Sequence, residues 1–342
     1  MLGPIEASLC PVLISTPNPA CAFHRLSPGV PSSILRQIPH LPPDRPLTLF
    51  FKPPAGLALS PGGGFGHGRA PRRKKKIPPM RIATWNVNSI KQRLENIVTW
   101  VSARQPDIVC LQETKCIDED FPRETFESLG YNVAIHGQKA FNGVALLSKL
   151  PFDEVTPGLS GDGTDPQARF LEGVVSSDSG VVRVGCLYLP NGNPPETEKY
   201  TYKINWMNRL IAYSLERLPL EEMFILAGDF NVIPTEADAA DPAAWVNDAL
   251  FLPPTREKFR ALTNLGLTDA VRAASDAPGL YTFWDYQAGA WQKNKGIRID
   301  HLLLSPRAAD RLTGAGIDKH VRAWERPSDH VPVFVDLAIN AP

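Results

Sequence analysis

Six short segments of this chain end in acidic, amide or histidine residues at the points where β-strands should stop. The segments are residues 84–88, 111–114, 187–191, 228–231, 298–300 and 328–330. Polar side chains at strand ends emerge from the edge of a rigid sheet, where a site for a hard cation and a phosphate can be assembled. The pattern therefore predicts metal-dependent cleavage of a phosphoester.

Glu113 is the first acidic residue in these segments. It follows the apolar run 108–111, which has the character of a central strand, so its carboxylate is expected at or near a sheet edge. Such a carboxylate suits Mg²⁺ or Mn²⁺, which need only one or two protein ligands while water and phosphate supply the rest. Taken alone, Glu113 could instead be a helix N-cap partner or a member of a surface ion pair.

Asp229 and Asn231 follow the apolar run 223–227 at spacing i, i+2, which places both side chains on one face of an extended chain. A carboxylate beside an amide can orient a water molecule and accept its proton. Asn86 and Asn88 have the same spacing. Taken alone, either pair could instead belong to an Asx-rich turn.

His330 gives the sharpest signal, because it stands beside Asp329 and leads into an apolar strand. Adjacent side chains on a strand point apart, so Asp329 is not expected to orient the imidazole. Asp300 is the expected partner, in a dyad that would hold His330 in one tautomer. A histidine held in this way can donate a hydrogen bond to a developing oxyanion.

The composition is that of a globular protein, with 342 residues, 43% of them apolar, and a formal charge of zero. Zero net charge neither indicates nor excludes a nucleic-acid partner, because a neutral protein can carry a local basic face. The five cysteines are irregularly spaced, as expected for reduced thiols. No run approaches the roughly 20 apolar residues of a membrane-spanning helix, so a soluble protein with no membrane partner is expected.

Residues 1–79 are crowded with proline and glycine, contain only Glu6 and Asp44 as acidic residues, and end in a basic run at 72–76. Such a segment cannot bury enough apolar surface to offset its ordering entropy, so disorder is expected. Three origins are open: an over-extended reading frame with the true start at Met80, an organelle transit peptide, or a nuclear-localisation or DNA-tethering tail. A cytoplasmic location is expected, with organelle or nuclear targeting as the alternatives.

Residues 80–342 read as a single catalytic domain of α/β class. Strands are expected at residues 81–87, 107–111, 131–135, 144–148, 173–175, 181–188, 223–228, 301–305 and 331–338, and helices at 90–104, 200–218 and 256–265. About ten strands with few helices between them favour two stacked sheets over a doubly wound parallel sheet. We predict a four-layer α/β sandwich, with two mixed sheets face to face, helices outside, and the site at one end of the sheets.

Together the motifs resemble the exonuclease III type of apurinic/apyrimidinic endonuclease, within the endonuclease/exonuclease/phosphatase superfamily. The resemblance covers about three quarters of the chain, from Arg81 to Ala338. Its motifs lie at residues 85–88, 106–115, 130–133, 143–148, 228–231, 298–300 and 328–330. Gln112-Glu113-Thr114-Lys115 is the most specific of them, because most other superfamily members depart from it after the glutamate.

The resemblance implies a divalent metal, Mg²⁺ or Mn²⁺, bound by Glu113 with Asn86 in support and Asp329 close by. The rest of the implied metal-binding set is Asp229, Asn231 and His330.

The resemblance also implies catalytic roles. Asp229, braced by Asn231, would position and deprotonate the attacking water. His330, held by Asp300, would neutralise charge on the phosphate as the transition state forms.

The implied substrate contacts come from two further segments. Tyr188 and Asn191 match the family's Tyr-x-Pro-Asn/Gln segment and would touch the scissile phosphate. Phe283, Trp284 and Ile297 stand at the segments that seat a base-free deoxyribose, and which of the two rings faces the sugar is left open.

The implied reaction is hydrolysis on the 5′ side of an abasic site in duplex DNA, leaving a 3′-hydroxyl, together with 3′→5′ exonuclease activity and cleaning of blocked 3′ ends. The implied partner is double-stranded DNA, and the enzyme is expected to be a monomer. Basic residues that could face DNA phosphates are Lys199, Lys203, Lys293, Lys295 and Arg298.

One rival function is hydrolysis of a small or lipid phosphoester, against which Gln112–Lys115 and the aromatic pair argue. The other is an inactive DNA-binding scaffold, against which the complete set of catalytic positions argues.

Overall fold

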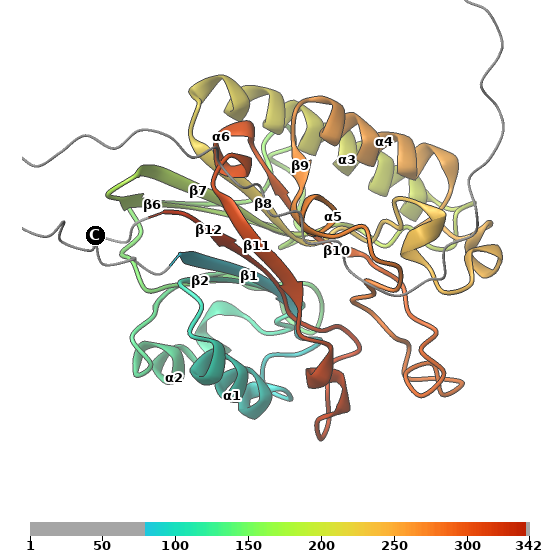
Figure 1. Cartoon of the computed structure of the whole chain (residues 1–342), viewed down its shortest axis with the longest axis horizontal. Helices are drawn as coiled ribbons and strands as arrows, with labels where there is room; N and C mark the ends of the chain where they lie inside the picture. The colour runs from blue at the N-terminus through green and yellow to red at the C-terminus, as the bar shows by residue number, and fades with distance from the viewer. Residues whose placement is uncertain (1–78, 340–342) are drawn as a thin grey trace, which may run out of the picture. The chain divides into compact units, whose positions relative to one another are not determined.

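Two six-stranded sheets are formed by residues 79–339, the part of the chain that the computed structural model describes (Figure 1). The first sheet has the strand order β11-β12-β1-β2-β4-β3, with bounds β1 Met80–Asn86, β2 Ile108–Gln112, β3 Asn132–His136, β4 Val144–Ser148, β11 Leu312–Ile317 and β12 Val333–Leu337. The second has the order β5-β6-β7-β8-β10-β9, with bounds β5 Glu154–Pro157, β6 Phe170–Ser177, β7 Gly180–Tyr188, β8 Met223–Asp229, β9 Thr268–Asp269 and β10 Asp300–Leu304. Both sheets are mixed, because β1 pairs with β2 and β7 with β8 in parallel, whereas the other pairs are antiparallel.

Helices cover the outer faces of the two sheets (Figure 1). The first sheet is covered by α1 Leu94–Arg104 and α2 Arg123–Glu127, and the second by α3 Glu198–Arg217 and α4 Pro253–Asn264. The shorter elements are α5 Ala270–Ala274, α6 Pro306–Ala309, η1 Asp118–Asp120, η2 Leu218–Leu220, η3 Glu236–Asp238, η4 Pro242–Trp245 and η5 Lys319–Ala323, where η marks a 3₁₀ helix.

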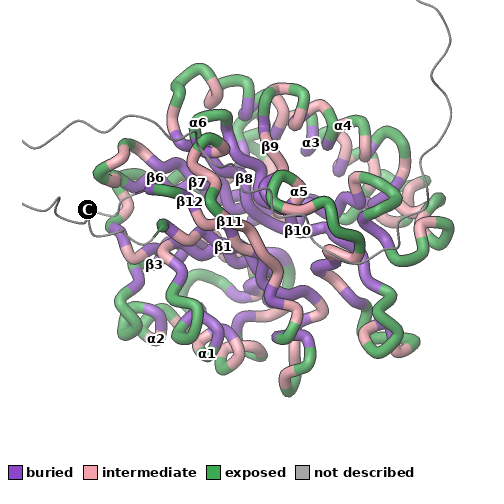
Figure 2. The backbone as a smooth tube through the Cα atoms, in the orientation of Figure 1, coloured by how far each residue is buried: buried purple, intermediate pink, exposed green. Residues whose placement is uncertain are grey.

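The buried residues show why these layers hold together. Ile82 of β1 and Ile225 of β8 belong to one core between the sheets, whereas Trp100 of α1 and Trp206 of α3 belong to two separate outer cores. Figure 2 shows the same division, with buried residues concentrated along the central strands and exposed residues on the loops and the outer sides of the helices. The predicted four-layer α/β sandwich is confirmed.

The strand register brings the polar strand ends to one edge of the sandwich. The parallel pairs place Asn86 beside Gln112, which precedes Glu113, and Tyr188 beside Asp229. The antiparallel pair of β8 and β10 then sets Asp300 opposite Asp229. Residues far apart in the sequence thus meet because their strands end or begin at the same level.

The differences from the predicted elements have local causes. The strand expected at 173–175 is the middle of the longer β6, and the helix expected from residue 90 begins at Leu94. The edge strands β5 and β11 were missed because β5 is exposed throughout and β11 contains two glycines, so neither shows an apolar alternation. The extension predicted at residues 1–79 lies outside the described residues, apart from Pro79. Among residues 79–339, none of the helices has both the length and the apolar character needed to cross a bilayer.

A buried charge network lies beside the strand that carries Asp300. Arg298, predicted to face DNA phosphates, is instead buried, and its guanidinium donates to Asp238 and to Asp269, each at 2.7 Å. Burial raises the pKa of the Asp238 carboxyl, but Arg298 and Arg272 outweigh it and hold the pKa at about 2. Asp238 is therefore ionised and held by two guanidinium groups.

Replacing Asp238 with asparagine is expected to destabilise the fold by about 3 kcal/mol, because Arg298 would keep its buried charge with one partner fewer. Urea unfolding at pH 7 measures this difference. Since the folded-state pKa of Asp238 lies below its ordinary value of 3.8, the stabilisation is complete above that pH and is lost as the pH falls toward 2.

The matched control is the Lys91–Asp120 ion pair, whose side chains are both 56% exposed. Replacing Asp120 with asparagine is expected to cost less than about 1 kcal/mol, because water screens the pair. Equal losses in the two variants would contradict the structural role assigned to Asp238.

Candidate active site

A cavity of about 290 Å³ opens at the edge of the sandwich where the polar strand ends meet. Eight residues predicted as site residues line it: Glu113, Tyr188, Asn191, Asp229, Asn231, Phe283, Asp329 and His330. The other lining residues are Asn193, Trp245, Leu250, Asp285 and Ile299. Asn86 and Asp300 are fully buried behind this lining and hydrogen-bond to it. Most of the predicted site residues are thus gathered around one cavity.

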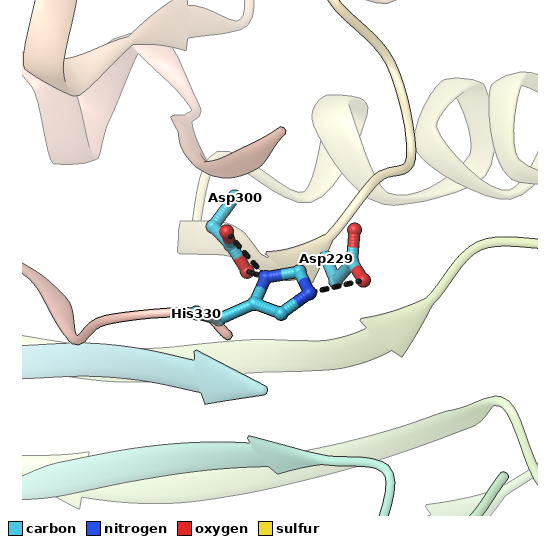
Figure 3. A group of neighbouring side chains, drawn as sticks. All are labelled: Asp229, Asp300 and His330. Atoms are coloured by element: carbon cyan, nitrogen blue, oxygen red, sulfur yellow. Dashed lines mark hydrogen bonds and ion pairs between the residues drawn. The ribbon is translucent and has the colours of Figure 1, made fainter. Parts of the chain in front are cut away.

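His330 lies between two carboxylates (Figure 3). Its Nδ1 atom is 2.9 Å from Asp300 Oδ2, and its Nε2 atom is 3.7 Å from Asp229 Oδ2. Burial lowers the pKa of His330, but Asp300 and Asp229 outweigh it and raise the pKa to about 10. At neutral pH His330 is therefore a cation that Asp300 orients and that presents Nε2 toward Asp229.

Asp229 is held by hydrogen bonds to both of its oxygens. The backbone N–H of Asn231 donates to Oδ1 at 2.9 Å, and the side-chain amide of Asn86 donates to Oδ2 at 3.0 Å. Burial raises the pKa of the Asp229 carboxyl to about 7, although the charge of His330 opposes this. A carboxylate with a pKa near neutrality suits a general base, because it is ionised often enough to accept a proton and basic enough to hold it.

Glu113 lies next to Asp229, because one amide nitrogen bridges them: Asn86 Nδ2 also donates to Glu113 Oε1 at 2.8 Å. Burial raises the pKa of the Glu113 carboxyl, but Lys115, whose ammonium lies 2.8 Å from Oε2, outweighs it and lowers the pKa. The backbone is strained here, with φ of 53° at Glu113 and 48° at Asn231, in the left-handed region that non-glycine residues rarely adopt. Such strain is concentrated at functional sites.

The Glu113 edge of the cavity has oxygen atoms that could bind a divalent cation. The Lys115 ammonium bonds to Glu113 Oε2 and Asn88 Oδ1, so two oxygens already converge on a positive charge. Asp329 is adjacent, because its Oδ1 accepts from Asn88 Nδ2 at 3.1 Å. Carboxylate and amide oxygens are the ligands that Mg²⁺ and Mn²⁺ take, so the residues fit such an ion.

A second cluster of possible metal ligands consists of Asp229, Asp300 and His330, whose candidate ligand atoms lie within 4.8 Å of one another. There, however, the Nδ1 atom of His330 is within 3.1 Å of both Asp300 oxygens. A cation between these residues would have to break that pair. The Glu113 edge therefore suits a cation better than the dyad does.

Tyr188 lines the cavity. Burial and the charges of Glu113 and Asp229 raise the pKa of the Tyr188 hydroxyl well above its ordinary value, so it stays protonated as a donor. The Arg169 guanidinium lies over the ring, 4.8 Å from its centroid. Tyr188 can therefore offer a hydroxyl hydrogen to a phosphate in the cavity.

Lys203 does not face DNA phosphates as predicted, because it is fully buried on the inner side of α3. Its ammonium donates to the backbone carbonyls of Asn191, at 2.9 Å, and Asn231, at 2.6 Å. Burial lowers the pKa of Lys203 to about 7. The lysine thus ties together the two loops whose asparagine side chains meet in the cavity, where Asn191 Nδ2 donates to Asn231 Oδ1 at 3.1 Å.

Replacing Lys203 with methionine is expected to lower kcat on DNA about a hundredfold, because small displacements of catalytic groups have effects of that size. DNA affinity should stay within about threefold of wild type, since Lys203 contributes no exposed charge. Single-turnover rates and binding isotherms measure the two effects separately. Lys203→Gln, which retains a donor, should recover part of the rate, and a folded Lys203→Met variant with wild-type kcat would show that the residue only supports the fold.

Of the three residues predicted to seat the sugar, only Phe283 belongs to the apolar wall of the cavity. This wall consists of Trp245, Leu250, Phe283 and Ile299. Trp284 is fully buried in a different cluster, and Ile297 is buried behind the wall. Of the two adjacent rings, Phe283 faces the cavity, and it packs on His330 with ring centroids 4.9 Å apart.

Sequence reasoning missed five lining residues: Asn193, Trp245, Leu250, Asp285 and Ile299. The signal for Ile299 was its place directly before Asp300, because Ile297, two residues earlier, does not line the cavity. Trp245, the last residue of η4, and Leu250 lie in the connection between β8 and α4, which is too short of regular structure for a period to indicate which side chains turn inward.

Chemically, the cavity combines a base, a cation and donors beside an apolar wall. Asp229 can accept a proton, His330 can neutralise developing negative charge, and Glu113 can hold a metal. An arrangement of this kind suits hydrolysis of a phosphoester whose neighbouring group is apolar.

Comparisons with known proteins agree with this chemistry. A sequence profile of the Endonuclease/Exonuclease/phosphatase family matches residues 83–330. Exodeoxyribonuclease III of Haemophilus influenzae is 32% identical over 266 residues, an alignment that covers 75% of this chain and 100% of the relative. Among solved structures, the 3′ phosphatase NExo from Neisseria bound to a product DNA hairpin is 36% identical, with a TM-score of 0.73 and coverage of 75% of this chain and 99% of that one. An AP endonuclease from Archaeoglobus fulgidus is 33% identical, with a TM-score of 0.72 and coverage of 75% and 99%.

Proposed function

The chain belongs to the endonuclease/exonuclease/phosphatase family, and on that premise we propose that it hydrolyses the phosphodiester on the 5′ side of an abasic site in duplex DNA. It is a hydrolytic nuclease of DNA repair, like the exodeoxyribonuclease III and AP endonuclease to which it is similar. The proposal extends to 3′→5′ exonuclease activity and to cleaning of blocked 3′ ends, with the enzyme acting as a monomer.

The observation that supports the abasic substrate is the apolar wall beside the catalytic groups. Phe283, Trp245 and Leu250 line the same cavity as Asp229 and His330. A deoxyribose without its base presents an apolar edge where a nucleotide carries a polar base. An apolar wall favours that sugar, because it offers no hydrogen-bond partner to a base.

In the proposed mechanism Asp229 orients a water molecule and accepts its proton as the water attacks phosphorus. The bond between phosphorus and the 3′ oxygen breaks, and that oxygen takes a proton from solvent to become the 3′-hydroxyl. His330, held in orientation by Asp300, directs its positive charge toward the phosphate oxygens, where negative charge develops in the transition state. The hydroxyl of Tyr188 and the amide of Asn191 position the phosphate. Preorganised charge and positioning carry most of the catalysis, with no covalent intermediate.

Glu113 and Asp329, with support from Asn86 and Asn88, would hold a divalent cation, Mg²⁺ or Mn²⁺. When bound, this cation supplies Lewis-acid neutralisation of the phosphate. Lys115 would then exchange its contact with Glu113 for one with solvent or with DNA.

The substrate class is tested by comparing turnover of three substrates at equal concentration. They are a duplex with one abasic analogue, the same duplex with an intact base, and inositol or sphingolipid phosphates. We expect incision of the first to be the fastest. Turnover of the small phosphoesters without incision of the abasic duplex would instead establish a phosphatase of the same superfamily.

A further inference from the structure

His301 is a fully buried histidine that the proposed mechanism does not use. It follows Asp300 on β10, and adjacent side chains on a strand point to opposite sides, so Asp300 meets His330 whereas His301 does not line the cavity. Its ring packs on Phe230 and Phe259, with ring centroids 5.4 Å and 4.8 Å away. An apolar side chain would fill this space without burying polar atoms, so packing alone does not account for the imidazole.

The hydrogen bonds of His301 determine its tautomer. Nδ1 lies 2.9 Å from Arg298 Nη1, and Nε2 lies 3.0 Å from the carbonyl oxygen of Val232. A guanidinium can only donate, so Nδ1 accepts, and the single ring hydrogen on Nε2 is donated to the Val232 carbonyl. Burial and the charge of Arg298 lower the pKa of His301 to about 4, so the ring is neutral at pH 7.

Arg298 is a fixed donor, because the two carboxylates of the buried charge network hold it. Its Nη1 group donates both to Asp269, at 2.7 Å, and to His301, while its Nε donates to Asp238 at 2.7 Å. The network therefore sets the orientation of a neutral imidazole whose other nitrogen binds the backbone at Val232.

Val232 belongs to residues 229–233, which we call the catalytic loop because it carries Asp229 and Asn231. The backbone N–H of Asn231 donates to Asp229 Oδ1 at 2.9 Å. To do so, Asn231 adopts a left-handed conformation with φ of 48°, which costs free energy and persists only where surrounding contacts hold it. The orientation of Asp229 thus depends on the contacts that hold this loop.

Three consecutive residues of the catalytic loop are held from outside it. The carbonyl of Asn231 accepts from the Lys203 ammonium at 2.6 Å, and the next carbonyl accepts from His301. The N–H of Ile233 then donates to the Leu250 carbonyl at 2.9 Å. Because Lys203 comes from α3 and His301 from β10, the turn at Asn231 is fixed between a helix and a strand.

We propose that His301 is a positioning residue for the hydrolysis, which holds the Val232 carbonyl and thereby the left-handed turn that directs the Asn231 N–H to Asp229. An apolar residue at this position would serve the fold as well, because replacing buried polar groups with apolar residues of similar size is often neutral for stability. It would, however, leave the Val232 carbonyl without its donor. The inference rests on the proposed function, because the loop carries the base of that reaction.

Two substitutions separate the roles of the two ring nitrogens. Glutamine reaches the position of Nε2 and keeps a donor for Val232, whereas asparagine reaches only the position of Nδ1 and keeps an acceptor for Arg298. On a duplex with one tetrahydrofuran abasic analogue, His301→Asn should lower the single-turnover rate constant about tenfold, because a small displacement of Asp229 slows the reaction. DNA affinity should stay within about twofold, and His301→Gln should keep the rate within about threefold of wild type.

Phe259→Leu is the control for support of the fold, because it removes a buried ring that packs on His301 and leaves both hydrogen bonds in place. It should lower the midpoint of urea unfolding and leave the incision rate within about twofold of wild type. His301→Leu fills the same space and donates nothing, so it repeats the test if the asparagine variant does not fold. Its rate should also fall about tenfold.

Hydrogen exchange measures the state of the loop without turnover. The amide hydrogens of a peptide spanning residues 229–233 should exchange about tenfold faster in His301→Asn and His301→Leu than in wild type, as expected for the loss of one hydrogen bond. His301→Gln and Phe259→Leu should exchange as wild type does.

A folded His301→Asn or His301→Leu variant with the wild-type rate and wild-type exchange would overturn the positioning role. Equal losses of rate in His301→Gln and His301→Asn would overturn it as well, because the donor to Val232 would then make no difference. If the wild-type enzyme does not incise the duplex, the proposed function fails, and the exchange rates still decide whether His301 holds the loop.

Discussion

Asp229→Asn is expected to lower kcat on an abasic duplex at least about a thousandfold, while DNA affinity stays within about threefold. The asparagine keeps the size of the side chain but cannot accept a proton from water. It also removes a negative charge 3.7 Å from His330 Nε2, and this charge would repel rather than attract a DNA phosphate. Single-turnover incision and a binding isotherm on the same duplex measure the two quantities.

Asp276→Asn is the matched control, because it makes the same chemical change at an exposed carboxylate that does not line the cavity. Its rate should equal that of wild type. An Asp229→Asn rate within tenfold of wild type would mean that another group accepts the proton.

His330→Ala is expected to lower kcat between a hundred- and a thousandfold, the usual effect of losing a group that stabilises transition-state charge. Exposed His320 is the control, and His320→Ala should leave the rate unchanged. A His330→Ala enzyme that retained more than a tenth of the rate would remove the imidazole from the mechanism.

The pH dependence of Asp300→Asn tests whether the dyad maintains the charge of His330. Asp300 raises the pKa of His330, so the asparagine variant should have a lower His330 pKa. Activity that depends on the charged imidazole should then be lost at a lower pH than in wild type as the pH rises. An unchanged alkaline limb of the rate profile would count against this role.

The dyad itself was predictable from the sequence. Asp300 and His330 are 30 residues apart, but each adjoins a strand at the same edge, and the pairing of Asp300 with Asp229 fixes their level. Glu113 was predictable for the same reason, because the apolar run before it has the character of a central strand. Polar residues at strand ends are a strong signal for a site, because the pairing of strands in a sheet leaves few possible positions for the strand ends.

Side chains that depend on tertiary packing were less predictable. Lys203 was expected to face DNA phosphates, yet it lies on the apolar stripe of α3 with Trp206, Met207 and Leu210, at spacings of three, four and seven residues. That spacing was the available signal for burial. For Phe283 and Trp284 no such signal exists, because adjacent residues on an extended chain point apart and the sequence does not say which face is the cavity.

The most direct test of the account is incision of a labelled duplex that carries one tetrahydrofuran abasic analogue, with Mg²⁺ and with EDTA. The analogue cannot undergo β-elimination, so a cut must be hydrolytic. We expect a single incision immediately 5′ to the analogue, in Mg²⁺ only, with a 3′ end that a polymerase can extend. No incision, or equal incision in EDTA, would contradict metal-dependent hydrolysis at this site.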